Sequence, residues 1–466
     1  MDEMQAQPAQ PCSDAEVLFL EGCRRMEDGD GEAEGYFRKA LALAPDLAEA
    51  WINLGLLFDQ RGEPEAAETC YRRAMELAPG CAEVPLNLGG LLINAKRFAE
   101  AGEICQKAVA LAPASAPAWT NLGVLKACLH LEEDAESCYR TALALEAGHP
   151  EALFNLSYIL LRQGRFAEGW SCLEARPWYQ ALAARLPFPR WQGEDIHGRA
   201  ILIGIEAGHG DMIQLCRYAT ELKVRGAKRV GLLCHPGLKA LFATLTDVDA
   251  VIPVAGQMPD LSWDFWVPPL SLPYRCETRL ETIPAHLPYL AAPADRVEKW
   301  AALALPEGVR VGLVWRGNPK FENDADRSLP SLGLLAPLWS VPGARFISLQ
   351  KGAGEDEARR PPEGLALLAL GGELDDFADT AALIERLDLL ICVDTAVAHL
   401  AGALGKPCWV LLPDHRTDWR WLTGRSDSPW YPGALRLFRQ TETGWEAVIA
   451  EVATALEAFV GDARGC

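Results

Sequence analysis

Long apolar runs are the first feature that this sequence lacks. Half of its 466 residues are hydrophobic, yet no uninterrupted apolar stretch reaches the roughly 18 residues that a membrane-spanning helix needs. The first residues, MDEMQAQPAQP, are polar and acidic, unlike a secretory signal. We therefore expect no stable membrane insertion and a protein that stays in the cytoplasm.

The sequence also lacks the spacings of a metal site or a disulfide framework. Its 14 cysteines include no CxxC pair and show no metal-ligand spacing with the 8 histidines. Cys70, Cys105 and Cys138 fall on the apolar faces of amphipathic segments, where a reduced thiol packs as a small apolar group. We expect no disulfide, no metal and no cofactor.

The sequence also has few basic residues compared with acidic ones. The chain has 44 Lys and Arg against 64 Asp and Glu, a net charge of −20, which disfavours a nucleic-acid partner because phosphate binding needs a basic patch. Residues 1–180 carry much of the excess, with 15 basic against 28 acidic side chains. This acidic part is either an ordinary solvated surface or a surface that selects a neutral or basic protein segment.

What the sequence does contain is a repeat of 34 residues. The pattern of WINLG at residues 51–55 recurs at 85–89, 119–123 and 153–157. The second half of the repeat recurs as well. Its members are Ala67, Tyr71 and Ala74, then Ala101, Cys105 and Ala108, then Ala135, Tyr139 and Ala142. The pattern resembles the tetratricopeptide helix-turn-helix and implies four to five repeats over residues 14–180, stacked into an α-superhelix with a concave groove.

One asparagine occupies the same place in four successive repeats. These residues are Asn53, Asn87, Asn121 and Asn155. A side-chain amide can both donate to and accept from an extended peptide, so four amides facing a solvated groove could hold an acceptor backbone. The arrangement resembles the asparagine ladder of the eukaryotic O-GlcNAc transferases. The alternative is that asparagine is simply common at this repeat position.

Residues 387–413 predict a strand, a sharp turn, a helix and a second strand. Residues 387–393 and 408–412 are apolar, as buried parallel strands are. Asp394 and Thr395 suit the start of a helix over residues 396–404, which Gly405 would end. A helix N-terminus at the carboxyl edge of a sheet favours a diphosphate, and an aspartate there can bind sugar hydroxyls. The alternative is that Asp394 and Thr395 only cap the helix and that His399 lies in the core.

The phrase DTAVAHLAGALGKP at residues 394–407 resembles the DTGxxHLAxALxKP signature of the bacterial heptosyltransferase-type (family 9) glycosyltransferases. The resemblance implies a GT-B fold of two Rossmann-like domains, which needs no metal and holds a nucleotide-sugar diphosphate at this helix. It implies that Asp394, Thr395, Ala396 and His399 bind the donor. Ala396 stands where the family usually has glycine.

A second motif is the glycine-rich turn GHGDMIQL at residues 208–215, which follows an apolar segment. It resembles the glycine-aspartate loop of the same family, in which the aspartate is the proposed general base, and so implies that Asp211 takes the acceptor proton. Taken by itself, Asp211 could also be no more than a helix cap. His209 is a second candidate, because a neutral histidine can accept a proton at pH 7.

Polar residues follow two strands of the second half. Arg327 and Ser328 come after a polar loop, and Gln350 and Lys351 end the next strand, so all four are expected to project toward the interdomain cleft. In the resembled family basic residues here contact phosphate, which implies that role for Arg327 and Lys351 beside Ser328 and Gln350. The sequence 324–326, DAD, resembles a metal motif of a different glycosyltransferase fold, and we interpret it as an exposed loop.

These patterns together predict an α-superhelix followed by an α/β region. The expected limits are repeats at 14–180, a connector at 181–196, and GT-B halves at 197–306 for the acceptor and 307–460 for the donor. The resemblance implies a metal-independent transfer of sugar from a nucleotide donor to a Ser or Thr hydroxyl of a protein recruited by the repeats. Flagellin is the most concrete acceptor, since some bacterial proteins of this architecture glycosylate it. The alternatives are heptose transfer to a lipid-linked saccharide and a non-catalytic nucleotide-binding scaffold.

Overall fold

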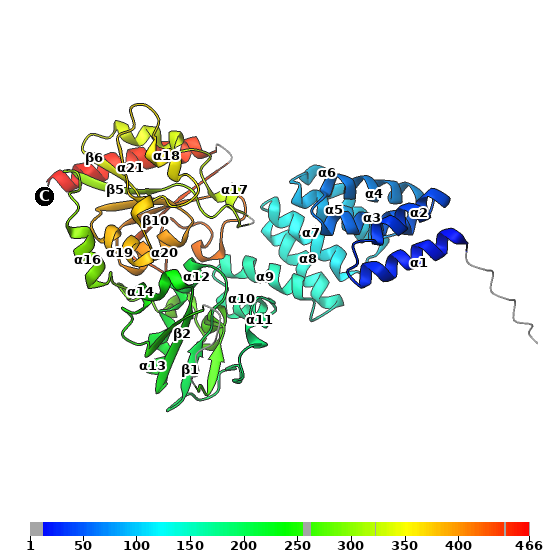
Figure 1. The fold of residues 1–466 in the computed structure, drawn as a ribbon, viewed down its shortest axis with the longest axis horizontal. Helices are drawn as coiled ribbons and strands as arrows, with labels where there is room; N and C mark the ends of the chain where they lie inside the picture. Colours follow the sequence, from blue (N-terminus) through cyan, green and yellow to red (C-terminus); the bar gives the residue numbers. More distant parts are fainter. Residues whose placement is uncertain (1–12, 255–261, 322, 442–443, 466) are drawn as a thin grey trace, which may run out of the picture. The chain divides into compact units, whose positions relative to one another are not determined.

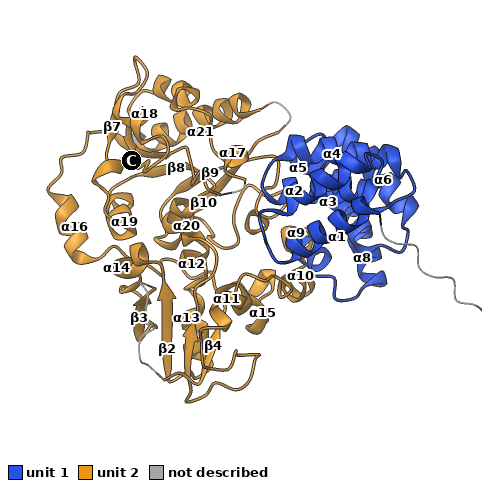
Figure 2. Cartoon of the chain, turned by 45° about the vertical axis from the view of Figure 1, so that its right-hand side comes forward, with its two compact units in different colours: residues 1–156 blue, residues 157–466 orange. Residues whose placement is uncertain are grey.

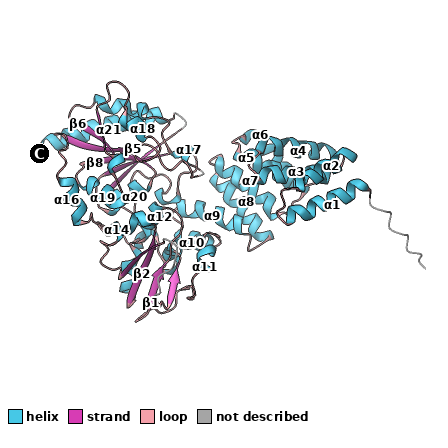
Figure 3. Cartoon of the chain, in the orientation of Figure 1, coloured by secondary structure: helices cyan, strands magenta, loops and turns pink. Residues whose placement is uncertain are grey.

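The computed structural model describes residues 13–254, 262–321, 323–441 and 444–465 (Figure 1). The acidic start of the chain lies outside these ranges. The chain divides into two compact units, Met1–Leu156 and Ser157–Cys466 (Figure 2). The first is helical and the second contains parallel sheets covered by helices (Figure 3), so the predicted fold class is confirmed.

The first unit consists of antiparallel helix pairs. Its helices are α1 (Asp14–Glu27), α2 (Ala33–Leu43), α3 (Ala48–Gln60), α4 (Pro64–Leu77), α5 (Glu83–Asn94), α6 (Phe98–Leu111), α7 (Ala116–Cys128) and α8 (Glu132–Leu145). Helix α9 (Pro150–Arg162) runs across the division between the units.

A glycine in the first helix of a pair lets the second helix approach closely. A Cβ added at Gly55 would lie 2.6 Å from the Tyr71 ring, and one at Gly123 would lie 2.5 Å from the Tyr139 ring. Gly89 meets the Cys105 sulfur in the same way, at 2.8 Å. The repeated small residue is therefore what allows paired helices to pack closely, as the 34-residue pattern predicts.

The second unit contains two parallel sheets. The first has the order β3-β2-β1-β4, and its strands are β1 (Ala200–Ile203), β2 (Arg229–Cys234), β3 (Ala250–Pro253) and β4 (Phe265–Val267). The second has the order β10-β9-β8-β5-β6-β7. Its strands are β5 (Val309–Val314), β6 (Ala344–Ser348), β7 (Leu367–Ala369), β8 (Leu389–Val393), β9 (Cys408–Leu412) and β10 (Leu435–Arg439). Strands β8 and β9 are buried throughout, as their apolar sequences predict.

Short helices connect and cover the strands. In chain order they are α10 (Phe166–Leu173), α11 (Gln180–Ala183), α12 (His209–Leu215), α13 (Tyr218–Val224), α14 (Lys239–Phe242), α15 (Leu272–Arg275), α16 (Ala294–Ala301), α17 (Asp324–Arg327), α18 (Glu355–Arg359), α19 (Phe377–Glu385), α20 (Ala396–Ala403) and α21 (Trp445–Gly465). The 3-10 turn η6 spans Trp419–Trp421.

The sequence suggests one continuous helix from residue 212 to 225, but the structure has two. The break lies at Cys216 and Arg217, between α12 and α13. The buried Arg217 side chain explains it, because its Nε donates to the Gln214 carbonyl at 2.8 Å, an acceptor that a continuing helix would use.

Helix α10 is built into the second unit. The Trp170 Nε1 donates to the Thr278 carbonyl at 2.9 Å, and its ring meets the Trp419 ring edge-on at 5.1 Å. Arg176, just after α10, is fully buried and forms an ion pair with Glu206 at 2.7 Å. The helix therefore contacts both sheet-containing halves.

Candidate active site

The two predicted turns meet through the N-terminal ends of α12 and α20. A Cβ added at Gly210, in the first turn of α12, would lie 2.9 Å from the His399 ring and 3.3 Å from the Ala396 Cα. Only a residue without a side chain allows this approach. Helices α12 and α20, which lie side by side in Figure 1, follow strands of different sheets. Their contact joins Gly210 to His399, a residue almost 190 positions later, as a GT-B fold requires.

Asp211 lies at this meeting point. One carboxylate oxygen accepts the Gly208 N–H at 2.8 Å, and the other forms an ion pair with Arg420. The side chain remains 21% exposed. The turn before it includes Ala207 at φ 57, a left-handed conformation that costs a non-glycine residue about 1–2 kcal/mol. Asp211 is therefore both a helix cap and a partly accessible carboxylate.

Arg420 is a residue that the sequence analysis did not identify. Its side chain is 7% exposed and pairs with Asp418 at 2.9 Å as well as with Asp211. The guanidinium also donates to the Gln214 side chain and lies 4.3 Å from the centre of the Trp419 ring. The signal in the sequence is a charged pair inside an aromatic segment, DWRW at 418–421.

The start of α20 offers polar groups that the protein leaves unused. Thr395 is the N-cap residue, but its side chain makes no capping bond, and within the described residues its buried Oγ1 has no hydrogen-bond partner. Asp394 before it is half-buried, and burial together with the nearby Asp418 raises its pKa to about 6. The positive charges of Arg327 and Arg420 act in the opposite direction on this pKa.

His399 is a buried histidine of α20. Its Nδ1 lies 2.9 Å from the Tyr431 hydroxyl, and its ring stacks on Trp421 with centroids 5.2 Å apart. Burial, assisted by the charges of Arg420 and Arg217, holds its pKa well below the usual value, so the ring is neutral at pH 7. Through these contacts with Tyr431 and Trp421 the ring holds the first turns of α20 in place.

Arg327 and Ser328 close a loop beside α20. The Ser328 hydroxyl accepts the Gly317 N–H at 2.8 Å, and the Arg327 Nε pairs with Asp324 at 3.2 Å. Arg327 influences the pKa of Asp394, which places its charge near the helix start. Asp324, from the discounted DAD sequence, is buried and serves as a partner for Arg327.

Gln350 and Lys351 are engaged elsewhere. The buried Gln350 amide accepts the N–H groups of Trp315 and Arg316 at 2.9 and 3.0 Å and donates to the Ala353 carbonyl at 2.7 Å. The Lys351 ammonium donates to the Leu374 carbonyl. These bonds join the loops at one edge of the second sheet to one another. We therefore infer that both side chains stabilise those loops and do not contact the donor.

His209 stacks between two rings at the same end of the first sheet. Its ring centroid lies 4.4 Å from that of His235 and 5.2 Å from that of Phe377, which begins α19. Burial and the neighbouring His235 lower the pKa of His209 to about 4, so it is neutral at pH 7. His209 therefore stays a second candidate for the proton acceptor, with its ring in contact with two others.

The asparagine ladder is only partly directed outward. The Asn53 Nδ2 donates to the Cys23 sulfur at 3.1 Å and the Asn121 Nδ2 to the Leu86 carbonyl at 3.0 Å, each in the preceding repeat. The Asn87 Nδ2 is buried without a partner among the described residues, and Asn155 is half-buried. Asn53 and Asn121 thus each use one amide N–H within the stack of repeats, and the binding of an acceptor by the four amides stays a prediction.

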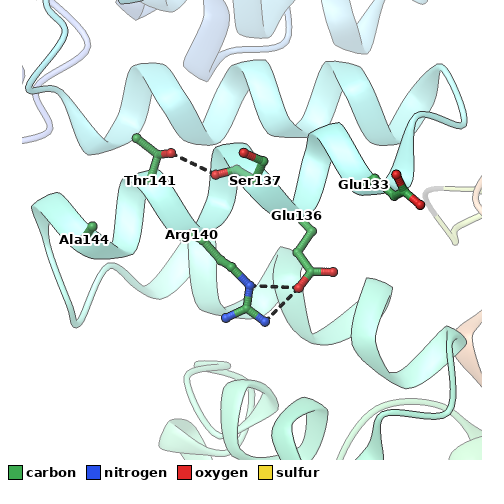
Figure 4. A pocket seen from close by; sticks show the side chains of 6 residues that line it. All are labelled: Glu133, Glu136, Ser137, Arg140, Thr141 and Ala144. Carbon is green, nitrogen blue, oxygen red and sulfur yellow. Dashed lines mark hydrogen bonds and ion pairs between the residues drawn. The ribbon is translucent and has the colours of Figure 1, made fainter.

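An open hollow of about 530 Å³ lies along α8. It is lined by Glu133, Glu136, Ser137, Arg140, Thr141 and Ala144 (Figure 4). Arg140 pairs with Glu136 at 2.7 Å, and the Thr141 hydroxyl donates to the Ser137 carbonyl at 2.9 Å. These polar groups are used within their own helix, so the hollow indicates no ligand.

The described ranges contain neither a cluster of metal ligands nor a membrane-spanning helix. No three His, Cys, Asp or Glu side chains there are grouped to hold a metal ion, and the cysteines there are free thiols. No helix in the same ranges is long and apolar enough to cross a membrane.

Comparison with known proteins supports the assignment of the repeats and of the segment that contains α20. Residues 345–416 match the glycosyltransferase family 9 (heptosyltransferase) profile, and residues 48–81 and 133–188 match tetratricopeptide repeats. Protein FlbA of Caulobacter vibrioides is 30% identical over 347 residues, which cover 67% of this chain and 56% of FlbA. The match thus spans little more than half of that relative.

Solved structures also resemble the chain. PilF of Pseudomonas aeruginosa is 23% identical with a TM-score of 0.32, covering 34% of this chain and 75% of its own. MamA of Desulfovibrio magneticus RS-1 is 19% identical with a TM-score of 0.31, covering 37% and 96%. Taken together, the motifs, the fold and the profile matches show that the chain carries tetratricopeptide repeats followed by a glycosyltransferase family 9 domain.

Proposed function

We propose that this protein is a glycosyltransferase that moves a sugar from a nucleotide donor to a hydroxyl of a protein recruited by its repeats. The observation that carries the proposal is the contact between α12 and α20, in which Gly210, the neighbour of Asp211, lies against the start of α20. A proton acceptor and an anion-favouring helix end are the two parts that glycosyl transfer from a diphosphate needs.

The donor diphosphate is proposed to bind at the start of α20. The helix dipole favours an anion at this end, and the unpartnered Thr395 hydroxyl supplies a donor. Arg420 and Arg327 supply positive charge to the same place. Asp394 is suited to accept hydrogen bonds from sugar hydroxyls.

The chemical step balances with the residues present. The acceptor oxygen forms a bond to the anomeric carbon of the sugar, and the bond between that carbon and the phosphate oxygen breaks, with its electron pair leaving on the diphosphate. Asp211 takes the hydroxyl proton and later releases it to solvent. A cation near the diphosphate stabilises the charge that develops as it leaves.

The repeats favour a protein acceptor. Stacked tetratricopeptide pairs offer a peptide-sized surface, and residues 1–180 carry 28 acidic against 15 basic side chains, which suits a neutral or basic segment. Flagellin Ser or Thr is the first acceptor to test. Heptose transfer to a lipid-linked saccharide and a scaffold without turnover are the competing proposals.

The test combines purified protein, flagellin and a panel of nucleotide sugars, with intact-mass measurement of the acceptor. Asp211→Asn should slow transfer by roughly 10² to 10⁴-fold while donor binding is retained, as loss of a general base does. Asp427→Asn is the matched control, since Asp427 is 58% exposed and pairs only locally with Arg425. Equal transfer by Asp211→Asn and wild type would exclude Asp211 as the base, and donor binding without transfer to any acceptor would favour the scaffold.

A further inference from the structure

The arrangement of Arg420 poses a chemical problem for the proposed base. Asp211 is ion-paired with the Arg420 guanidinium, so one of its two carboxylate oxygens is occupied by a cation and is not available to an acceptor hydroxyl. The other Asp211 oxygen accepts the Gly208 N–H at 2.8 Å. The base therefore needs to lose a partner before it can act.

Arg420 has a second partner that can hold it when Asp211 is released. Asp418 accepts both the Arg420 backbone N–H and its Nη1, at 2.9 and 3.0 Å. The bond to Asp211 uses the other terminal nitrogen, Nη2. Trp419 lies against one face of the guanidinium at 4.3 Å, and Trp170 of α10 supports that ring edge-on. Nη2 can thus change partner while the rest of Arg420 stays in place.

Buried donors around Arg420 are left without partners. Within the described residues these are the Gln214 amide Nε2 and the Thr395 hydroxyl at the start of α20. Buried polar groups in native proteins are nearly always paired, so these two unpaired donors favour a ligand with several acceptor oxygens. Gln214 is fixed beside the guanidinium, because its Oε1 accepts from the Arg420 Nε.

We propose that Arg420 is a switch between base and donor: it holds Asp211 in the free protein and passes to the donor diphosphate on binding, which frees Asp211 to accept the proton. This inference rests on the proposed function and adds to it an order of events. The donor must bind before the acceptor hydroxyl can be deprotonated, and the departing diphosphate keeps the cation until it dissociates. Arg327, which is paired with Asp324, is not coupled to the base in this way.

The switch predicts opposite effects of the two partners on diphosphate binding. Asp211→Asn removes the competitor for Arg420 and should tighten the binding of a nucleoside diphosphate about tenfold, or 1.4 kcal/mol. Arg420→Gln should weaken it at least tenfold. In the double variant the gain from Asp211→Asn should vanish, because no guanidinium is left to be released. An ion pair with only a structural role would weaken binding in both single variants.

The measurement is calorimetric titration of UDP, GDP, CDP, ADP and TDP into the full chain, with thermal melting to confirm folding. The exposed pair Arg425 and Asp427 supplies matched controls, Arg425→Gln and Asp427→Asn, which should leave affinity unchanged. Because Arg420 is buried, Arg420→Lys replaces the glutamine variant if the latter does not fold; it should reduce both the affinity and the gain from Asp211→Asn.

Each outcome decides a separate point. A gain from Asp211→Asn that persists without Arg420 would be simple relief of charge repulsion and would overturn the switch. Weaker binding in both single variants would overturn it as well. Failure of folded wild type to bind any of the five nucleotides would instead overturn the donor site and with it the proposed function.

Discussion

Gly210→Ala is the substitution that tests the meeting of α12 and α20 most directly. The new Cβ would lie 2.9 Å from the His399 Cδ2 and 3.3 Å from the Ala396 Cα. Carbon atoms in contact prefer about 3.5–4.0 Å, so the helices must separate by roughly 0.5–1 Å. The His399 ring cannot turn aside, because Tyr431 binds its Nδ1 and Trp421 stacks on its face.

Gly210→Ala is expected to lower turnover more than it lowers stability. Overpacking of this kind destabilises a fold by about 1–3 kcal/mol, whereas a displacement of about 1 Å between catalytic groups lowers rates by roughly 10²-fold. We therefore expect Gly210→Ala to retain its fold, with a moderately lower melting temperature, and to lose about two orders of magnitude in kcat.

The assay is initial-rate glycosyl transfer, or donor hydrolysis, beside thermal melting. Gly237→Ala is the matched control in the same half, since a Cβ there meets nothing within 4 Å and the backbone needs no left-handed conformation. A kcat of Gly210→Ala within twofold of wild type would show that close contact between the two helix ends is not required, and the proposed geometry of the site would be wrong.

Four further predictions follow from individual residues. Thr395→Val should weaken donor affinity by calorimetry without lowering the melting temperature, because the lost hydroxyl has no protein partner among the described residues; a stable variant with unchanged affinity would show that Thr395 does not contact the donor. The pKa of Asp394 is raised to about 6, so between pH 4 and 6 the folded protein binds a proton that the unfolded chain does not. The melting temperature of wild type should therefore fall relative to that of Asp394→Asn as the pH rises through this window. Melting temperatures that change in parallel would refute this. Activity should survive EDTA, and a loss that manganese restores would overturn the metal-independent mechanism. Asn121→Ala should lower the free energy of unfolding of the repeats by about 0.5–1.5 kcal/mol, and Asn87→Ala should lower it little. Both variants should reduce protein glycosylation if the amides hold the acceptor. Undiminished glycosylation would mean that the asparagines are repeat consensus only.

The parts of this protein that local pattern determines are those that the sequence predicts well. Strand β9 has the predicted limits, and α20 ends one residue early, because buried apolar runs and a glycine stop are properties of neighbouring residues. The repeats follow from a small residue and a ring spaced along the chain, such as Gly55 and Tyr71.

Contacts between distant segments explain what the sequence did not reveal. Arg420 acquires its significance from Asp211, a partner 209 positions away, and nothing in DWRW specifies that partner. The Gln350 side chain could equally have faced a ligand or its own loop, and the choice depends on the backbone N–H groups of Trp315 and Arg316. Arg217 breaks a helix because its charge must be satisfied by carbonyls on both halves, including those of Gln214 and Trp430.

The attachment of α10 has a consequence for how such proteins can be recombined. Trp170 reaches Thr278 on one half and Trp419 on the other, and Arg176 reaches the turn that leads to Asp211. A chimera in which all residues up to 180 are replaced would remove α10. It would also disturb Trp419, whose ring packs between Trp170 and Arg420. A chimera joined ahead of α9, by contrast, would keep α10 and its contacts, so the upstream repeats could be exchanged without disturbing the surroundings of Arg420.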